Sequence, residues 1–318
     1  MLRAHLHYSS GVLLFAPIRG LVSFIGGAVT AAILVIPDWS LQAASPVRAP
    51  DARPRLLDSS FQFTEGPAAD SKGNVYFTDQ PNDRIMIWTT DGRLETFMQP
   101  AGRSNGLYFD LRGNLLACAD EKNQLWEIDS EKNVVVLVKD LGGKLLNGPN
   151  DLWVDPNGGV YFTDPFYKRD YWGRDEKQIE KENVYYLPPN RSEVRVAAGG
   201  FIRPNGMIGS PDGRRLYVAD LGGRQTYVYE IGTNGVLSNR KPFVSMGSDG
   251  MTMDAEGNVY LTGRGVTVFD SEGKQIDQIP INKGWTANVC FGGERFRTLF
   301  ITAMDSLFAL DMKVGGAQ

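Results

Sequence analysis

A pattern of about forty residues repeats six times along this chain and limits the folds that it can adopt. Each copy has a polar residue, a short apolar stretch, a turn rich in Asp, Gly and Asn, and a second apolar strand. Aligned on that second strand, the copies are spaced by 40, 45, 56, 43 and 40 residues. The aligned residues are Val75, Leu115, Val160, Leu216, Val259 and Leu299. This period is typical of one four-stranded propeller blade per repeat.

The residues inside each repeat indicate strands rather than helices. The apolar stretches alternate with polar residues at a period of two and are rich in Val, Tyr, Phe and Thr. The second half of a repeat, for example residues 84–98 (RIMIWTTDGRLETFM), supplies two more alternating strands with a turn between them. We therefore predict an all-β fold, a six-bladed β-propeller with four-stranded blades, over residues 55–318.

The first 54 residues differ in composition from the repeats. Arg3 and Arg19 precede an apolar run of 16 residues, Leu21–Ile36, which is short for a membrane span and typical of a signal-peptide core. We expect residues 1–45 to be a leader and the protein to be exported, periplasmic or secreted. The alternatives are an uncleaved anchor, which would be its contact with a membrane, or a start placed too far upstream, which would leave the protein cytoplasmic. Residues 46–54 are expected to form an extended linker.

The composition of the repeats excludes several kinds of catalysis. The two histidines are His5 and His7, so the predicted propeller has no imidazole for a Ser-His-Asp or Cys-His pair or a histidine-bound zinc. Cys118 and Cys290 lie in apolar strings and are predicted to be buried free thiols, with a disulfide as the alternative. Residues 55–318 hold 29 basic and 35 acidic residues, and this acidic balance argues against nucleic acid as a partner.

The residue that opens each copy points to a functional site. It precedes the aligned second-strand residue by 10 or 11 positions, and in every copy its side chain carries an oxygen atom. In a propeller the innermost strands surround a central channel, so equivalent positions form a ring. The predicted ring is Glu65, Asn105, Asn150, Asn205, Asp249 and Asn288. The alternative is that these are ordinary turn residues, since Asn-Gly and Asp-Gly are common turn dipeptides.

Two carboxylates confined in one channel favour a bound cation. Glu65 and Asp249 would repel each other and lose hydration unless a positive charge offsets them. Together with the amide oxygens of Asn150 and Asn205 they predict an all-oxygen site for one divalent metal ion. Such a donor set suits Ca²⁺ best, although Zn²⁺ or Mg²⁺ could occupy the site in vitro.

The chain resembles the gluconolactonase, regucalcin and luciferin-regenerating-enzyme family. The resemblance rests on Glu65 in EGP, Asn150 in PND, Asn205 in RPNG and Asp249 in SDGM, and it covers roughly residues 65–303. It implies that these four residues bind one divalent metal and that Asp249 is also the general base. Animal members have an arginine two residues before the asparagine that matches Asn150, whereas this chain has Gly148, so their sugar-acid preference does not transfer.

The resemblance implies hydrolysis of a cyclic lactone, a small-molecule substrate. The metal would polarise the carbonyl while Asp249 accepts a proton from the attacking water. An insertion at residues 165–183 is predicted to protrude over one face, with a solvated charged excursion as the alternative. From the ring and this loop we expect substrate contacts from the four residues Asn105, Tyr167, Arg169 and Trp172. Arg169 could instead pair with Asp170 or Glu176 at the surface.

Two other classes of function stay open at this point. The same metal site could hydrolyse another ester or a phosphotriester, and a propeller can also bind a partner without catalysing a reaction.

Overall fold

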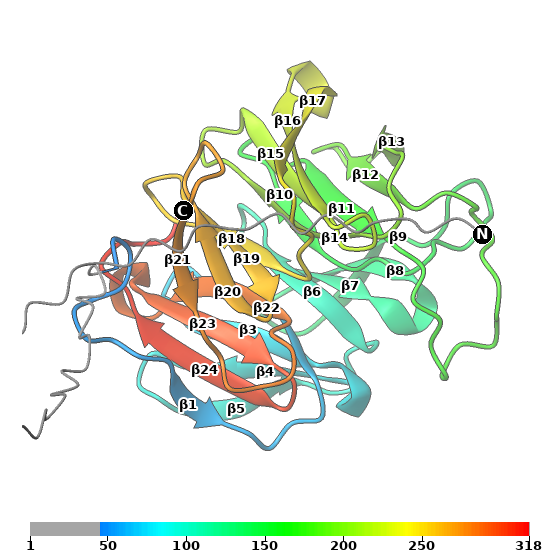
Figure 1. The fold of residues 1–318 in the computed structure, drawn as a ribbon. Coiled ribbons are helices and arrows are strands. Elements are labelled where there is room, and N and C mark those ends of the chain that lie inside the picture. The colour runs from blue at the N-terminus through cyan, green and yellow to red at the C-terminus, as the bar shows by residue number, and fades with distance from the viewer. Residues whose placement is uncertain (1–44, 318) are drawn as a thin grey trace, which may run out of the picture. The chain divides into compact units, whose positions relative to one another are not determined.

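The computed structural model describes residues 45–317, and nearly all of them belong to six four-stranded antiparallel sheets (Figure 1). The predicted leader, apart from Ser45, lies outside the described residues. Short 3₁₀ helices are the only helices in this part of the chain, and none of the described helices is long and apolar enough to cross a membrane. The expected all-β fold, a six-bladed propeller, is confirmed.

The first three blades each consist of four strands that are consecutive in the chain. Blade 1 contains β2 (Thr64–Ala69), β3 (Val75–Asp79), β4 (Arg84–Trp88) and β5 (Leu94–Met98). Blade 2 contains β6 (Ser104–Phe109), β7 (Leu115–Ala119), β8 (Gln124–Ile128) and β9 (Val134–Val138). Blade 3 contains β10 (Leu152–Val154), β11 (Val160–Asp164), β12 (Asn183–Leu187) and β13 (Arg195–Ala198). The 3₁₀ helices in this half are η1 (Gln80–Asn82) and η2 (Asp120–Lys122).

The next two blades repeat this order, and the last blade departs from it. Blade 4 contains β14 (Pro204–Gly209), β15 (Arg215–Asp220), β16 (Gln225–Ile231) and β17 (Leu237–Val244), with η3 (Thr233–Gly235) between the last two. Blade 5 contains β18 (Met251–Met253), β19 (Val259–Gly263), β20 (Gly265–Phe269) and β21 (Gln275–Ile279). Blade 6 contains β22 (Asn288–Gly292), η4 (Glu294–Phe296), β23 (Thr298–Ala303) and β24 (Ser306–Asp311), and its fourth strand is β1 (Arg55–Asp58).

The pairing of β1 with β24 closes the ring of blades with a strand from the other end of the propeller. The register is antiparallel, with Arg55 opposite Ala309 and Leu56 opposite Phe308. Figure 1 shows β1 in blue beside β24 in red. The sixth repeat supplies three strands of its own, so β1 completes the last sheet and covers an edge that would otherwise be open.

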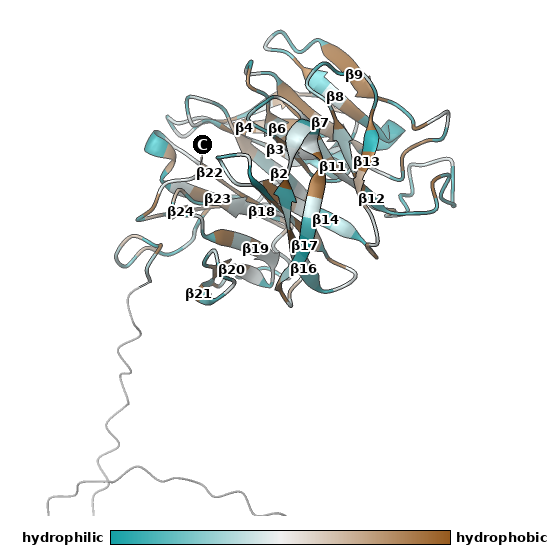
Figure 2. Ribbon diagram, turned by 90° about the horizontal axis from the view of Figure 1, so that it is seen from above, coloured by the Kyte–Doolittle hydropathy of each residue, from teal (hydrophilic) through white to brown (hydrophobic). Residues whose placement is uncertain are grey.

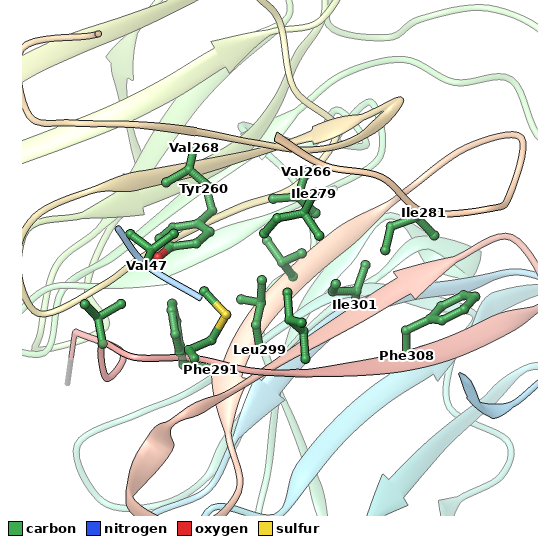
Figure 3. Close-up of a cluster of buried hydrophobic side chains, with 14 of the residues drawn as sticks. Val47, Tyr260, Val266, Val268, Ile279, Ile281, Phe291, Leu299, Ile301 and Phe308 are labelled. Atoms are coloured by element: carbon green, nitrogen blue, oxygen red, sulfur yellow. The ribbon is translucent and has the colours of Figure 1, made fainter. Parts of the chain in front are cut away.

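The hydrophobic core lies between neighbouring blades. One cluster joins blade 5 to blade 6 and includes Tyr260, Val268, Leu299 and Ile301, all fully buried (Figure 3). Each strand places alternate side chains on opposite faces of its sheet, so a blade contributes to the clusters on both sides. Cys118 and Cys290 belong to two such clusters as buried free thiols, as expected.

The segment expected to be a linker, residues 46–54, differs from that expectation because it packs against the last two blades. Val47 is 1% exposed and joins the cluster in Figure 3. Arg48 forms an antiparallel bridge with Met312, and its Nε lies 2.8 Å from the Asp277 carboxylate in β21. The Pro-rich composition indicates a free linker, but these apolar and charged contacts hold the segment against the propeller.

The turn between the first two strands of a blade follows from its Asp and Gly residues. In blade 1 one carboxylate oxygen of Asp70 accepts the backbone N–H groups of Lys72 and Asn74, each at 2.9 Å. Gly73 then takes a φ of +85°, which suits glycine, and an added Cβ would lie 2.2 Å from the carbonyl oxygen of Gly293. This turn returns the chain from the channel-lining strand to the second strand. It therefore lies at the opposite end of the inner strand from the ring residue.

Candidate functional site

The six predicted ring residues lie at the start of the six inner strands. Four are the first or second residue of β2, β6, β14 or β22, and Asn150 and Asp249 stand two residues before β10 and β18. Five of the side chains are buried, and that of Asp249 is partly exposed. The predicted convergence therefore occurs at the end of the channel where the inner strands begin.

A glycine follows the ring residue in four blades because the backbones crowd together there. A Cβ on Gly66 would lie 2.1 Å from the Asn105 carbonyl oxygen, and one on Gly206 would lie 2.7 Å from the Asp249 carbonyl oxygen. At Gly250 the clash would be with the side chain of Asn288, at 1.9 Å. Real Cβ atoms do not approach other atoms so closely. The Asn-Gly and Asp-Gly pairs thus serve close approach between neighbouring blades.

A chain of hydrogen bonds links the ring residues of blades 4 and 5. The side-chain amide of Asn205 donates to Asp249 Oδ1 at 2.8 Å and to the hydroxyl oxygen of Tyr167 at 2.9 Å. The other oxygen of Asp249 accepts a hydrogen bond of 2.5 Å from the indole N–H of Trp285. These two N–H donors hold the Asp249 carboxylate in one orientation, and both of its oxygens keep a lone pair that can accept another hydrogen bond or bind a cation.

The carboxylates affect one another strongly. Burial and the nearby charge of Asp249 raise the pKa of Glu65 well above its ordinary value, against the effect of a hydrogen bond from the Gly66 N–H. Burial also raises the pKa of Asp249, to about 6, although Trp285, Asn205 and the charge of Arg169 lower it. Asp249 therefore lies close enough to Glu65 for its charge to oppose the ionisation of Glu65, a situation that a bound cation relieves.

The amide oxygens at the ring suit a hard cation. Within residues 45–317 the side chains of Asn105 and Asn150 form no hydrogen bond to the protein, although both are buried. The described residues hold no group of three or more His, Cys, Asp and Glu side chains placed to bind a metal, so amide oxygens are needed to complete a site. Two carboxylates plus amides form an all-oxygen donor set that suits a hard divalent cation.

The insertion predicted at residues 165–183 begins at the same end of the channel, and residues 165–182 contain no strand before β12 begins at Asn183. It follows β11, which runs antiparallel to the inner strand β10 and therefore ends where the ring residues lie. Tyr167 reaches Asn205, as described above. Arg169 pairs with Asp120, at 2.8 Å from Nε to Oδ2, rather than with Asp170 or Glu176.

Trp172, expected near the substrate, is 8% exposed and lies within the base of this loop. Its indole N–H donates to the backbone oxygen of Asp120 at 2.7 Å, and its ring lies against Phe166 and below the guanidinium of Arg174. These contacts place Trp172 among the side chains that hold the loop, and they do not support a direct contact with substrate.

The far part of the channel holds a separate cavity of about 880 Å³. It is lined by later residues of the inner strands, such as Ala68, Leu107 and Met207, and reaches Asp151 and Asn288. Burial raises the pKa of Asp151 to about 7. Glu65, Asn150, Asn205 and Asp249 do not line this cavity, whereas the ring residue Asn288 does. The cavity therefore extends from the opposite end of the inner strands as far as one ring position.

Two residues at the site were not predicted from the sequence. Trp285 stands three positions before the ring residue Asn288, in a KGWTAN stretch, and this offset from a ring position was the available signal. Asp120 follows an apolar strand like the other strand-end aspartates, and its different role depends on contacts with a loop about fifty residues away, which no local pattern reveals.

Comparisons with known proteins agree with this architecture. A family model described as the SMP-30/Gluconolactonase/LRE-like region matches residues 63–305. A gluconolactonase of Zymomonas mobilis is 29% identical over 293 residues, which cover 82% of each chain. The structure of a gluconolactonase from Xanthomonas campestris superposes with a TM-score of 0.78 at 30% identity, covering 83% of this chain and 91% of the other.

The fold is shared more widely. The calcium-binding protein regucalcin from Agrobacterium tumefaciens has a TM-score of 0.70 at 19% identity, covering 83% of this chain and 95% of that one. At that identity the likeness concerns the fold alone. The family match spans most of the described residues, and the ring residues from Glu65 to Asn288 fall inside it. The chain therefore belongs to the SMP-30/gluconolactonase/LRE-like family, and the gluconolactonases among its relatives support its assignment to the lactonases.

Proposed function

We propose that this lactonase opens a sugar-acid lactone at the ring end of the channel and that it needs one divalent metal ion to do so. The observation that carries the proposal is the meeting of two carboxylates, Glu65 and Asp249, with buried ring amides. Those of Asn105 and Asn150 have no hydrogen-bond partner among residues 45–317. The gluconolactonase relatives support the substrate class. Because residues 55–318 contain no histidine that could activate a serine or cysteine, we expect water to be the nucleophile.

The residues that would hold the ion are Glu65, Asn150, Asn205 and Asp249. Their oxygens supply two negative charges and neutral donors, which favours Ca²⁺ over softer ions, and the regucalcin that shares the fold is a calcium-binding protein. Zn²⁺ or Mg²⁺ would then be substitutes in vitro. When bound, such an ion stabilises negative charge that develops on the lactone carbonyl oxygen.

Asp249 is the residue best placed to accept the proton of the attacking water. Its carboxylate is oriented by Trp285 and Asn205, and burial raises its pKa to about 6, nearer to neutrality than an ordinary aspartate. With its orientation fixed, an unused lone pair of Asp249 can face the water. The proton leaves with the ring-opened product as the hydroxyl of the former ester oxygen.

Substrate contacts would come from the ring and the inserted loop. The Tyr167 hydroxyl lies beside Asn205, and the Arg169 guanidinium is close enough to lower the pKa values of Glu65 and Asp249. Asn105, whose amide is free at the channel, would bind a substrate hydroxyl. These groups suit a lactone that carries several hydroxyl groups.

The test is hydrolysis of an aldonolactone, an aryl ester and a phosphotriester, each with and without a chelator. We expect the lactone to be the preferred substrate, with activity lost on chelation and restored by Ca²⁺. Asn150→Ala should weaken calcium binding measured by calorimetry, whereas Asn133→Ala, in an exposed hairpin, should not. Preference for another ester would change the substrate class. Inactivity towards all three compounds with calcium bound would favour a binding module.

We also propose that the protein is exported, on the basis of the apolar run Leu21–Ile36 and the small residues after it. Sequencing the N-terminus of the protein purified from its native cell tests this. A mature chain that begins near residue 45 supports cleavage of a leader. A chain that retains residues 1–45 contradicts it.

A further inference from the structure

In three blades an aspartate at the end of the second strand has the same structural task. Asp79, Asp164 and Asp220 each accept two backbone N–H groups from the segment that enters the inner strand. The donors stand three and two positions before the ring residue: Gln62 and Phe63, Asn147 and Gly148, Ile202 and Arg203. Bonding of this kind, from a short Asp side chain to nearby backbone N–H groups, is common where a chain turns.

Blade 2 assigns that task to a different residue. Its register pairs Ser104 with Ala119, as blade 1 pairs Thr64 with Asp79, so an alanine occupies the usual aspartate position. The entering segment is held instead by Asp83, whose Oδ1 accepts the N–H of Ala101 at 3.0 Å and that of Arg103 at 2.6 Å. Asp120, one residue after Ala119, is thereby released from capping the backbone of its own blade.

The released carboxylate binds the inserted loop of the next blade. Asp120 is 2% exposed, and its Oδ2 accepts hydrogen bonds from Arg169 Nε at 2.8 Å and from the Tyr171 hydroxyl at 2.6 Å. Its backbone oxygen accepts the indole N–H of Trp172 at 2.7 Å. One buried residue thus holds three side chains from a stretch of four residues of the loop.

Neighbouring residues are shaped to allow this arrangement. A Cβ on Gly148 would lie 2.8 Å from Asp120 Oδ1 and 3.0 Å from the Trp172 ring, so a glycine is needed there. Two arginines, each two positions before a ring asparagine, flank the loop. The Arg103 guanidinium lies 4.6 Å from the centre of the Tyr171 ring, and that of Arg203 lies 4.9 Å from the centre of the Tyr167 ring.

We propose that Asp120 is a positioning residue, which anchors residues 165–174 over the ring end of the channel and orients Arg169 towards the substrate. The bond to Asp120 uses Nε of Arg169, and within residues 45–317 its two terminal nitrogens form no hydrogen bond. Those N–H groups remain available to a carbonyl or hydroxyl oxygen of a lactone. The proposal rests on the proposed function for its substrate, but the anchoring of the loop is independent of activity.

The experiment compares Asp120→Asn, which keeps the size of the side chain, with Arg169→Gln and with the double variant. Asp175→Asn is the matched control, because Asp175 pairs with Lys168 in the same loop but on its exposed surface, at 2.9 Å. We expect Asp120→Asn and Arg169→Gln each to raise KM for the lactone about tenfold with little change in kcat, as for the loss of a charged hydrogen bond. The double variant should match Arg169→Gln, since both changes break one arrangement.

A second readout follows the loop without any substrate. Under native conditions trypsin should cleave Asp120→Asn after Lys168, Arg174 or Lys177 at least about tenfold faster than it cleaves the wild type or Asp175→Asn. Mass spectrometry identifies the cleavage sites. Thermal unfolding checks that the blades of each variant stay folded. Equal cleavage of Asp120→Asn and the wild type would overturn the anchoring role. Fully additive KM effects, or a fall in kcat alone, would overturn the positioning of Arg169. If the wild-type protein does not hydrolyse the lactone but trypsin still cleaves Asp120→Asn faster than the wild type, the proposed function is refuted and the anchoring role of Asp120 stands.

Discussion

The side-chain amide of Asn205 donates a hydrogen bond of 2.8 Å to Asp249 Oδ1, and so joins the ring positions of two neighbouring blades. The two residues are 44 positions apart in the sequence, one repeat unit, and they meet because both stand at the start of an inner strand. The Asp249 carboxylate accepts a hydrogen bond from Asn205 on one oxygen and from Trp285 on the other.

Asp249→Asn should lower kcat for lactone hydrolysis by about 10²- to 10⁴-fold, the usual contribution of a general base. The amide keeps the shape of the side chain but cannot take up the proton of the attacking water. Calcium binding should weaken much less than kcat, so the rate is measured at saturating Ca²⁺ and the affinity by calorimetry. If saturating Ca²⁺ returns kcat of Asp249→Asn to the wild-type value, Asp249 only binds the ion and is not the general base.

Trp285→Phe should lower kcat by about tenfold or more, because a hydrogen bond to a charged group contributes about 1.5–3 kcal/mol. The phenyl ring retains most of the apolar contact but has no N–H to hold the Asp249 carboxylate. Trp88→Phe, in the third strand of blade 1, is the control and should keep the wild-type rate. Equal rates for the two variants would contradict the orienting role of Trp285.

Gly206→Ala should destabilise the protein by about 1–3 kcal/mol, the cost of forcing an extra group into a close-packed site. Its Cβ would lie 2.7 Å from the Asp249 carbonyl oxygen and 2.9 Å from Gly250, both of them backbone groups that cannot turn aside. Activity should fall as well, because Asp249 has to move. Denaturant unfolding measures the change. Gly284→Ala, where a Cβ meets no atom within 4 Å, should leave stability nearly unaltered.

Asp277→Asn should make the stability of the protein less dependent on acid pH. Burial alone would raise the pKa of Asp277, but hydrogen bonds from Arg48 and Ser45 outweigh it and the net shift is downward. The stabilisation is therefore present above the unfolded-state pKa of about 3.9 and is lost as the pH falls through the lower folded-state value. Thermal unfolding at neutral pH should show the variant to be less stable than the wild type.

The same comparison at acid pH completes the test of the Asp277 pair. The difference in Tm between the wild type and Asp277→Asn should shrink as the pH falls below about 4, because the wild-type carboxyl is then losing its charge. A difference that stays constant down to pH 3 would mean that the variant destabilises the protein by another route than the ion pair with Arg48.

Much of the fold was predictable because a propeller is built from a local pattern that recurs. Strand alternation and the Asp and Gly turns act over a few residues, so six copies reveal six sheets before any contact is known. The closing strand β1 escaped prediction because its partner, β24, is about 250 residues away in the chain. Likewise the burial of Val47 depends on a surface made by blades 5 and 6, which the composition of the segment does not indicate.

For the site, the sequence by itself determined which side chains converge, since the fixed offset of Glu65, Asn205 and Asp249 within each repeat places them at one end of the inner strands. Only the tertiary structure decided what holds them and what covers them. Trp285 reaches Asp249, and Asp120 turns from capping its own blade to binding Arg169. The physical reason is that equivalent positions follow from the period of the repeat, whereas contacts between a loop and a neighbouring blade depend on distances that only the closed ring of blades brings about.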